Sequence, residues 1–296
     1  LDFSEYGSLQ NLYKHDFQKF MEYNIRDTNL VNRLDDMHGI LGQTMATAYD
    51  AKVNFEDVYM QVRMWDVIVH NELLARGIVT PPKKYQRKDD QYAGAAVKEP
   101  IVGMHDWVVS YDLNSLYPHL IMQWNISPET LDPRSPALFD IDQFIKTPYD
   151  RAVFEPVPQA FCCAGNGYYF DTTIQGFLPE IMQEKYNTRK AAKAEQKKNE
   201  ELYEKAKDKK YKVLAAKHKN IQSAMKVQLN SAYGALGSEY FRLYDIRLAE
   251  AITLSGQLAI KWIIDRVNRF MNKTLGTTAV DYIIASDTDS IYVNFK

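Results

Sequence analysis

The amino-acid sequence predicts an α+β fold that combines several long helices with a small antiparallel sheet. Three observations support this prediction: apolar residues recur at helical spacing over long stretches, the β-branched and aromatic runs are short, and two of those runs flank a four-residue polar turn. The chain has 296 residues, enough for about two domains. Hydrophobic residues make up 46% of it, which excludes a mostly disordered protein.

The charges of the chain nearly cancel, because 36 basic and 38 acidic residues leave a formal net charge of −2. Taken alone, this balance argues against a nucleic-acid partner, although a whole-chain sum cannot reveal a local field. The two cysteines, Cys162 and Cys163, are adjacent and are predicted to be reduced thiols of a cytoplasmic protein. No apolar run approaches the roughly 20 residues that span a bilayer, so no membrane partner is expected.

Helical periodicity starts near the N-terminus. Apolar residues from Leu12 to Met37 recur at helical spacing and predict a helical stretch with one apolar face. A second helix is predicted from Met60 to Leu74. The segment from Pro81 to Asp90 has paired prolines, many charges and no periodicity, so it is predicted to be a linker or an exposed loop.

The middle of the chain begins with a predicted strand from Trp107 to Tyr111, a β-branched and aromatic run. Residues 132–158 are rich in Pro, Asp and aromatics and predict loops with short elements. Helices are predicted from Leu178 to about Glu204, from Tyr211 to Tyr233 and from Leu248 to Met271. A short basic connection joins the first two, which therefore form an αα-hairpin.

Three aspartates are predicted to gather where strands end. Asp112 follows the predicted strand, and Asp287 and Asp289 lie in the turn of a β-hairpin formed by residues 281–285 and 291–293. Neighbouring strands lie ~4.8 Å apart, so acids at one end of adjacent strands can converge. Carboxylates so placed can hold a pair of hard divalent ions, which suit an in-line phosphoryl transfer.

The tetrapeptide DTDS at 287–290 has a simpler interpretation when it is considered alone. Asp, Thr and Ser are ordinary turn residues, so a solvated turn is the more common reading of these four residues. A calcium-binding EF-hand loop is a weak alternative. The fifth position of such a loop holds Asp or Asn and the sixth holds Gly. Counted from Asp287, these two positions are Ile291 and Tyr292 here.

Two further motifs change this balance. DLNSLYP begins at Asp112, KVQLNSAYG begins at Lys226, and both precede DTDS. The three motifs, in this order, resemble those of the family B DNA polymerases, which read DxxSLYP, KxxxNSxYG and DTDS. The surrounding words WNISPET, NSAYGALG and YDIRLAEAIT are most similar to the replicative polymerases of T-even-type bacteriophages.

The resemblance covers nearly the whole chain and implies an internal fragment of such a polymerase. It predicts a palm with an antiparallel sheet, inserted helical-hairpin fingers and a mainly helical remnant of an exonuclease domain. The implied regions are the C-terminal end of a 3′–5′ exonuclease domain (1–39), a connecting helical segment (40–82), the first part of the palm (83–175), the fingers (176–237) and the second, truncated part of the palm without a thumb (238–296).

The resemblance also implies the metal ligands. Asp112 and Asp289 are expected to be the primary ligands of two Mg²⁺ ions, which Mn²⁺ can replace, and the backbone carbonyl of Leu113 is expected to assist. Asp287 is expected to be a weaker ligand. One departure is visible, because Ser286 stands where the family usually has Gly, which adds a side chain near the metals and removes no ligand.

The predicted hairpin presents cations and an aromatic ring. Lys226 and Asn230 are four residues apart and Tyr233 follows three later, so the three share a helix face, and Arg189 and Lys193 share one on the other helix. Lysines crowd this helix, so solvation alone could explain Arg189 and Lys193. The resemblance implies that Arg189, Lys193 and Lys226 bind the phosphates of the substrate and that Lys226 is also catalytic. It implies a polar contact from Asn230. Tyr233 and Gly234 are expected to form a surface for the nascent base pair.

The first motif supplies further substrate contacts in the resemblance, from Ser115, Leu116 and Tyr117. Tyr117 is expected to be the steric gate. A bulky ring beneath the incoming sugar leaves no room for the 2′-hydroxyl that distinguishes RNA precursors from DNA precursors.

Two shorter matches lie upstream. Tyr92, Gly94 and Ala95 fit the YxG(G/A) element that contacts single-stranded template in the family, although a plain Gly-containing turn fits nearly as well. Tyr23 and Asp27 fit Yx₃D, the last of the family's three exonuclease motifs. One aspartate cannot assemble a two-metal site, so no proofreading is expected from this chain alone.

The predicted function is therefore the catalytic region of a DNA-dependent DNA polymerase that transfers a nucleotide from a dNTP to a primer 3′-hydroxyl. The alternative is a catalytically incomplete fragment that binds dNTP, metal or DNA and needs a second chain. A reverse transcriptase is disfavoured by the NSAYG helix and by Yx₃D. Expected partners are primer–template DNA, dNTP and, in the full-length enzyme, a sliding clamp and other replisome proteins, in the cytoplasm of an infected bacterial cell.

Overall fold

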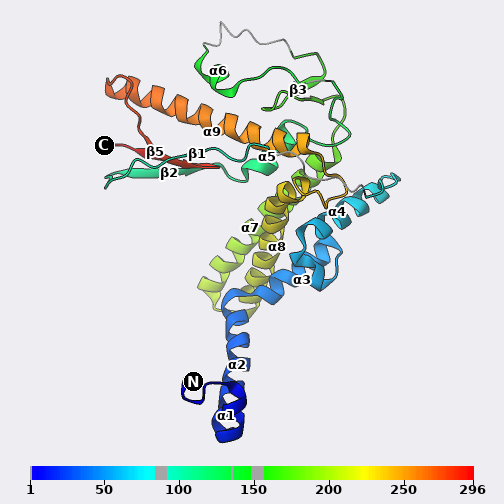
Figure 1. Ribbon diagram of the computed structural model, residues 1–296, viewed down its shortest axis with the longest axis vertical. Coiled ribbons are helices and arrows are strands. Elements are labelled where there is room, and N and C mark those ends of the chain that lie inside the picture. The colour runs from blue at the N-terminus through cyan, green and yellow to red at the C-terminus, as the bar shows by residue number, and fades with distance from the viewer. Residues whose placement is uncertain (1, 84–91, 135, 148–156) are drawn as a thin grey trace.

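The structure is a computed structural model that describes residues 2–83, 92–134, 136–147 and 157–296, and it confirms the α+β class (Figure 1). The helices are α1 (Leu9–His15), α2 (Phe17–His38), α3 (Ile40–Ala51), α4 (Gln61–Ala75), α5 (Leu116–Gln123), α6 (Ile141–Lys146), α7 (Phe177–Ala206), α8 (Lys209–Leu236) and α9 (Ile246–Leu275), with 3₁₀ turns at Ser4–Tyr6 and Phe55–Tyr59. The strands are β1 (Val97–Lys98), β2 (Val108–Asp112), β3 (Phe161–Cys163), β4 (Tyr169–Asp171), β5 (Ile283–Asp287) and β6 (Ser290–Asn294).

The main sheet has the order β1-β5-β6-β2, and all of its pairings are antiparallel. The predicted hairpin is present as β5 and β6, and β2 pairs with β6 so that Asp112 stands opposite Ser290. Helix α9 crosses one face of this sheet (Figure 1). Its Ile260 and Met271 pack with the buried side chains of Ile283 and Val293, and this apolar layer holds the sheet against the helix.

A second and larger core joins α4, α5, α7, α8 and α9. Trp65 on α4 is 1% exposed, and its indole Nε1 donates a hydrogen bond to the Ser231 hydroxyl on α8 at 3.0 Å. Buried indole N–H groups need such a partner, so this bond fixes the orientation of α4 against α8. Both cysteines are free thiols. None of the described helices is long and apolar enough to cross a bilayer.

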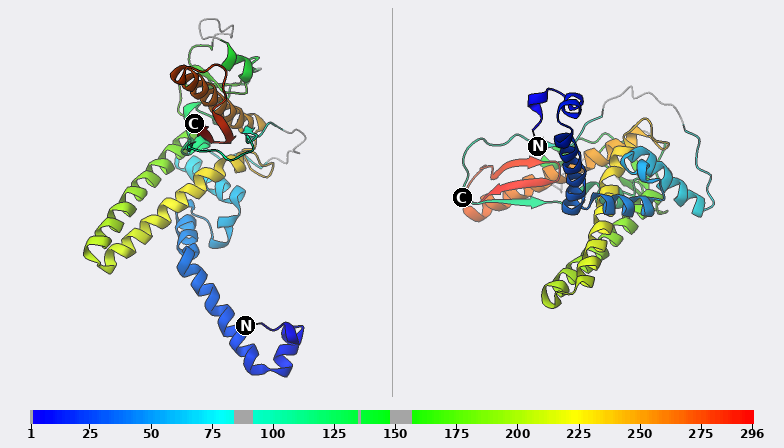
Figure 2. Two further views of the ribbon diagram at one scale, coloured as in Figure 1. Left: turned by 90° about the vertical axis from the view of Figure 1, so that its left-hand side faces the viewer. Right: turned by 90° about the horizontal axis from the view of Figure 1, so that it is seen from below.

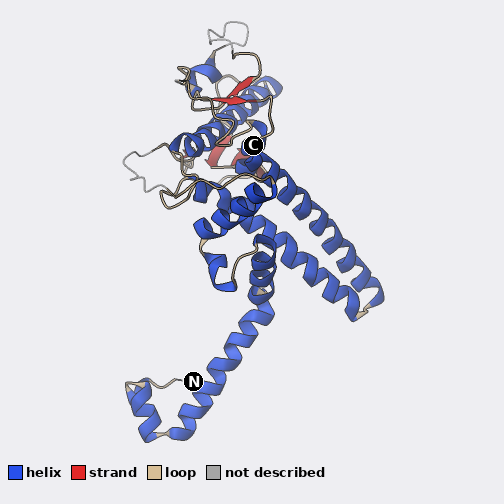
Figure 3. Cartoon of the chain, turned by 90° about the vertical axis from the view of Figure 1, so that its right-hand side faces the viewer, coloured by secondary structure: helices blue, strands red, loops and turns tan. Residues whose placement is uncertain are grey.

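The hairpin α7–α8 and the helix α2 both project from this body, and they diverge from one another (Figures 2 and 3). The hairpin matches the two predicted helices closely. At its tip Lys207 takes a left-handed conformation (φ 51°), and the Asp208 side chain accepts a hydrogen bond from the Lys210 amide in the first turn of α8. This combination of a left-handed C-cap and an aspartate N-cap turns the chain in two residues.

The N-terminal stretch differs from the prediction in two ways. The helix is interrupted at Asp16, whose side chain caps α2 by accepting the Lys19 amide at 2.9 Å. The predicted apolar face of α2 is covered only at its start, where Phe17 and Phe20 contact Tyr13 of α1. All 22 residues of α2 are described, and none of them is buried. Helix α3 lies in the segment 40–82, which was expected to be helical, although its bounds were not predicted. Helix α5 and the strands β1, β3 and β4 were not predicted, and the predicted linker 81–90 lies mostly outside the described residues.

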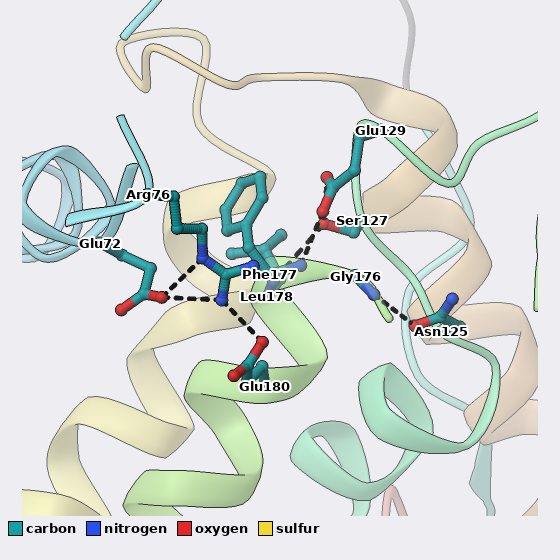
Figure 4. Close-up of polar contacts among 9 residues, drawn as sticks. All are labelled: Glu72, Arg76, Asn125, Ser127, Glu129, Gly176, Phe177, Leu178 and Glu180. Atoms are coloured by element: carbon teal, nitrogen blue, oxygen red, sulfur yellow. Dashed lines mark hydrogen bonds and ion pairs between the residues drawn. The ribbon is translucent and has the colours of Figure 1, made fainter. Parts of the chain in front are cut away.

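The first turn of α7 is capped by side chains from a distant loop (Figure 4). The Gly176 amide donates to Asn125 Oδ1 at 2.9 Å, and the Phe177 amide donates to a carboxylate oxygen of Glu129 at 2.6 Å. Helix N-termini have amides without intrahelical partners, and the carboxylate also complements the positive end of the helix dipole. The loop therefore holds the first turn of α7, at the base of the hairpin, against the rest of the molecule.

Replacing Asn125 by alanine should lower the free energy of unfolding by about 3 kcal/mol. Asn125 is 8% exposed, and its amide nitrogen also donates to the carbonyl oxygens of Asp171 (2.6 Å) and Ile174 (2.8 Å). Its φ of 50° is a left-handed backbone conformation, which costs alanine more conformational free energy than asparagine. Chemical denaturation measures the change. The exposed Asn187→Ala serves as the control, with a change within about 0.5 kcal/mol, and equal effects of the two variants would contradict the role of the cap.

Candidate functional site

The sheet brings Asp112 and Asp289 to one end of adjacent strands. Asp112 is the last residue of β2, and Asp289 lies in the turn before β6. The Leu113 amide donates to the backbone carbonyl of Asp289 at 2.7 Å, which continues the pairing of the two strands into the turn. Thr288 takes a left-handed conformation (φ 51°), as tight turns between strands require.

The two carboxylates influence one another. The pKa of Asp289 is raised above its ordinary value, chiefly by burial and then by the negative charges of Asp112 and Asp287. A divalent cation between such groups removes both causes, since it replaces lost hydration and neutralises the repulsion. Asp287 is exposed, and its carboxylate accepts a hydrogen bond from the Thr288 hydroxyl at 3.0 Å.

A cavity of about 490 Å³ opens at these carboxylates, and most of the predicted substrate-binding residues line it. Its lining consists of Asp112, Asn114, Ser115, Leu116, Tyr117, Pro118, Arg189, Lys226, Asn230, Thr288 and Asp289. It therefore places two acids from the sheet opposite two cations from the hairpin. Leu113, Asp287, Lys193, Tyr233 and Gly234 do not line it.

Arg189 is already oriented in this structure. Its Nη1 donates a hydrogen bond to the Ser115 hydroxyl at 2.9 Å, and its Nε is buried without a hydrogen-bond partner. Ser115 precedes α5 in a left-handed conformation (φ 56°), which aims its side chain at α7 rather than along its own helix. A buried guanidinium N–H without a partner is costly, so the site favours an anionic ligand at Arg189.

Tyr117, which lines the cavity, belongs to a cluster of three tyrosines with Tyr233 and Tyr92. The ring centroids of Tyr117 and Tyr233 are 4.8 Å apart, and the Tyr233 hydroxyl lies 3.1 Å from the Tyr92 hydroxyl. Burial raises the pKa of Tyr117, and the nearby Asp289 raises it further, so the ring remains a neutral phenol. Burial and the bond to Tyr92 likewise raise the pKa of Tyr233.

Some residues important for this arrangement were not predicted. Gly256 on α9 faces Tyr117, and a Cβ there would come within 3.2 Å of the Tyr117 ring. A glycine in the interior of a helix is a sequence signal for such a close approach. Asn114 and Thr288 also line the cavity, and both lie inside the recognised motifs. Gly94 contacts α9 through its carbonyl, which accepts from Gln257 Nε2 at 2.7 Å, whereas no polar contact of Ala95 is found in the described structure.

Tyr23 and Asp27 lie on α2, away from the cavity (Figure 1). The Tyr23 ring packs edge-on against Phe3 with centroids 5.2 Å apart, and Asp27 is exposed. Within the described ranges, no group of three or more His, Cys, Asp or Glu side chains is arranged to hold a metal ion. The candidate metal ligands are therefore the pair Asp112 and Asp289.

Comparisons with known proteins identify the family of the chain. The sequence profile of DNA polymerase family B matches residues 56–296. Over 97% of its length the chain is 31% identical to the DNA-directed DNA polymerase of Escherichia phage RB69 and 30% identical to that of Enterobacteria phage T4. It is also 29% identical, over 97% of its length, to the DNA polymerase delta catalytic subunit of Candida albicans, of which it covers 26%.

The fold is shared as well. The structure of a family B DNA polymerase from Pyrobaculum calidifontis superimposes with a TM-score of 0.57 at 23% identity, over 89% of this chain and 30% of that one. Fold and site thus define a polymerase-type α+β protein. The chain belongs to DNA polymerase family B. It spans 36% of the length of each of the two phage relatives.

Proposed function

We propose that this chain carries the nucleotidyl-transfer site of a DNA-dependent DNA polymerase. The observation that supports it best is the single cavity that places Asp112 and Asp289 opposite Arg189 and Lys226. Transfer of a nucleotide needs both halves of this arrangement, because negative charge develops on the triphosphate while the attacking hydroxyl must lose its proton.

The carboxylates fit a pair of Mg²⁺ ions, with Mn²⁺ as a substitute. Oxygen donors are what these ions prefer, and the raised pKa of Asp289 reflects a repulsion that a cation relieves. Asp112, Asp289 and the Leu113 carbonyl would hold the ions, with Asp287 contributing weakly. When bound, such ions supply positive charge at the attacking and leaving oxygens.

The side chains of the chain bind and orient the substrates. Arg189 and Lys226 hold the triphosphate, and Ser115 keeps Arg189 in position through its hydroxyl. We assign Lys193 a supporting contact from the exposed side of α7. Asn230 adds a polar contact, and this positioning of the two reactants is itself a large part of the catalysis.

The aromatic side recognises the sugar and the base. Tyr117 and Leu116 pack where the incoming sugar lies, and Tyr233 and Gly234 form the surface beneath the nascent base pair. Tyr92 supports Tyr233 through their hydroxyl contact, and we assign the 92–95 element, with Gly94 and Ala95, to contacts with the template strand.

The wider assignments follow the same family. We assign residues 1–39 to the end of an exonuclease domain, 40–82 to a connecting segment, 83–175 and 238–296 to the palm, and 176–237 to the fingers. Tyr23 and Asp27 would belong to an exonuclease site that these residues alone do not complete. A sliding clamp and other replisome proteins are the proposed partners of the whole polymerase, which acts in the cytoplasm of an infected bacterial cell.

Primer extension by the purified chain tests the proposal. With Mg²⁺ and dNTPs, extension should occur, the added nucleotide should follow the template base, and EDTA should abolish the reaction. Incorporation that ignores the template would overturn the assignment. Absence of extension together with retained binding of labelled dNTP would instead identify an incomplete fragment that needs further polypeptide.

A further inference from the structure

Helix α8 has an unusual distribution of charge. Along its 28 residues it contains six lysines and neither Asp nor Glu. Helix α7, which packs against it, mixes its lysines with glutamates, and two of them form the ion pairs Lys197–Glu201 and Lys198–Glu195. The positive charge of the hairpin is therefore concentrated on α8, where no acid of the same helix neutralises it.

Three of the lysines form a row. Lys212, Lys219 and Lys226 are spaced seven residues apart, so they lie on one face of α8 with a drift of about 20° at each step. All three are exposed, and within the described residues none of them has an ion-pair or hydrogen-bond partner. The residues between them on this face, Ala216 and Ser223, are small and leave the row accessible.

The row ends between two cavities. Lys226 and Asn230 line the cavity with the catalytic carboxylates, and they also line a second cavity of about 490 Å³. The second cavity adds Gln43 from α3 and Gln61 from α4. Amide side chains both donate and accept hydrogen bonds, as the edges of unpaired bases require.

We propose that this lysine row and the amide-lined cavity bind single-stranded DNA, with phosphates on Lys212 and Lys219 and a base in the cavity beside Lys226, which itself holds the triphosphate. The proposal rests on the proposed function, because the strand is the template on its way to the carboxylates. The path from Lys212 to the cavity beside Lys226 measures about 21 Å along the helix, farther than one triphosphate reaches, so a polymer fits the row better than a free nucleotide.

The salt dependence of oligonucleotide binding tests the row. For single strands, each phosphate neutralised by a lysine contributes about 0.7 to the slope of log K against log salt concentration. Lys219→Gln should therefore reduce the slope for a labelled oligothymidylate by about 0.7, and Lys212→Gln combined with Lys219→Gln by about 1.4. Lys217→Gln is the matched control, because it removes the same charge two residues away, on another face of α8. Its slope should equal that of the wild type.

Two outcomes would overturn the proposal. The first is an equal change of the salt slope in Lys217→Gln and Lys219→Gln. The second is an unchanged slope with weakened dNTP binding in the row variants, which would show that the row binds nucleotide instead of DNA. Helix content measured by circular dichroism shows that each variant is folded. The proposed function is tested separately by primer extension. If the wild-type chain extends primers and the lysine variants keep the wild-type salt slope, the lysine row is rejected and the polymerase activity is not. If the variants lower the slope but the wild-type chain does not extend primers, the polymerase activity is rejected and the row is not.

Discussion

Replacing Asp289 by alanine is expected to slow primer extension about a thousandfold, which corresponds to about 4 kcal/mol of transition-state stabilisation. Asp289 lines the cavity opposite Arg189 and Lys226, and its pKa shows that its charge is close to that of Asp112. Removing it leaves one of the two carboxylates that we propose as the primary ligands of the metal ions. Single-turnover extension under saturating dNTP isolates the chemical step from binding.

Asp287 offers a matched comparison two residues away, at the end of β5. Its side chain does not line the cavity and is exposed, so Asp287→Ala should reduce extension much less than Asp289→Ala. Thermal unfolding of both variants checks that the turn is intact. If Asp287→Ala were the more damaging change, the assignment of Asp289 as a primary ligand would be wrong.

Replacing Tyr117 by alanine should reduce discrimination against ribonucleotides about a hundredfold, or by about 2.7 kcal/mol. The Tyr117 ring is half-buried between Tyr233 and α9, where Gly256 allows it to approach closely. Because its neighbours hold the ring in place, it cannot swing away to admit a 2′-hydroxyl. The measurement is the ratio of kcat/KM for a dNTP and the matching rNTP.

Tyr117→Phe separates the two properties of the side chain. Phenylalanine keeps the ring and removes the hydroxyl, so it should retain most of the discrimination if exclusion is steric. Loss of discrimination in Tyr117→Phe, or its full retention in Tyr117→Ala, would contradict a steric gate.

Local patterns were sufficient to predict the elements that carry the site. Asp112 and Asp289 follow from two β-rich runs that end in acids, and the shared face of Lys226 and Asn230 follows from their spacing of four on a helix. The hairpin was predicted within a few residues because both of its helices are long and periodic. The roles of these residues in catalysis remain predictions.

Contacts between distant segments could not be predicted. The bond between Ser115 and Arg189 joins residues 74 apart and depends on a left-handed conformation before α5. The cap that Asn125 provides for α7 depends on a loop 51 residues away. The exposure of α2 was missed for a related reason, since periodicity shows which face is apolar but not whether anything packs against it.

Because Asn125 and Glu129 hold only the first turn of α7, a rotation about that turn would move the far end of the hairpin most. Helix α7 is about 45 Å long, so a rotation of about 10° about the loop at Asn125 carries its far end about 8 Å. Helix α8 is packed along α7 and would rotate together with α7. Lys226, near the pivot, would then travel less than Lys219, and Lys219 less than Lys212. A strand bound by Lys212 and Lys219, with a base in the cavity beside Lys226, would therefore be displaced unevenly by such a rotation, most of all at the tip of the hairpin.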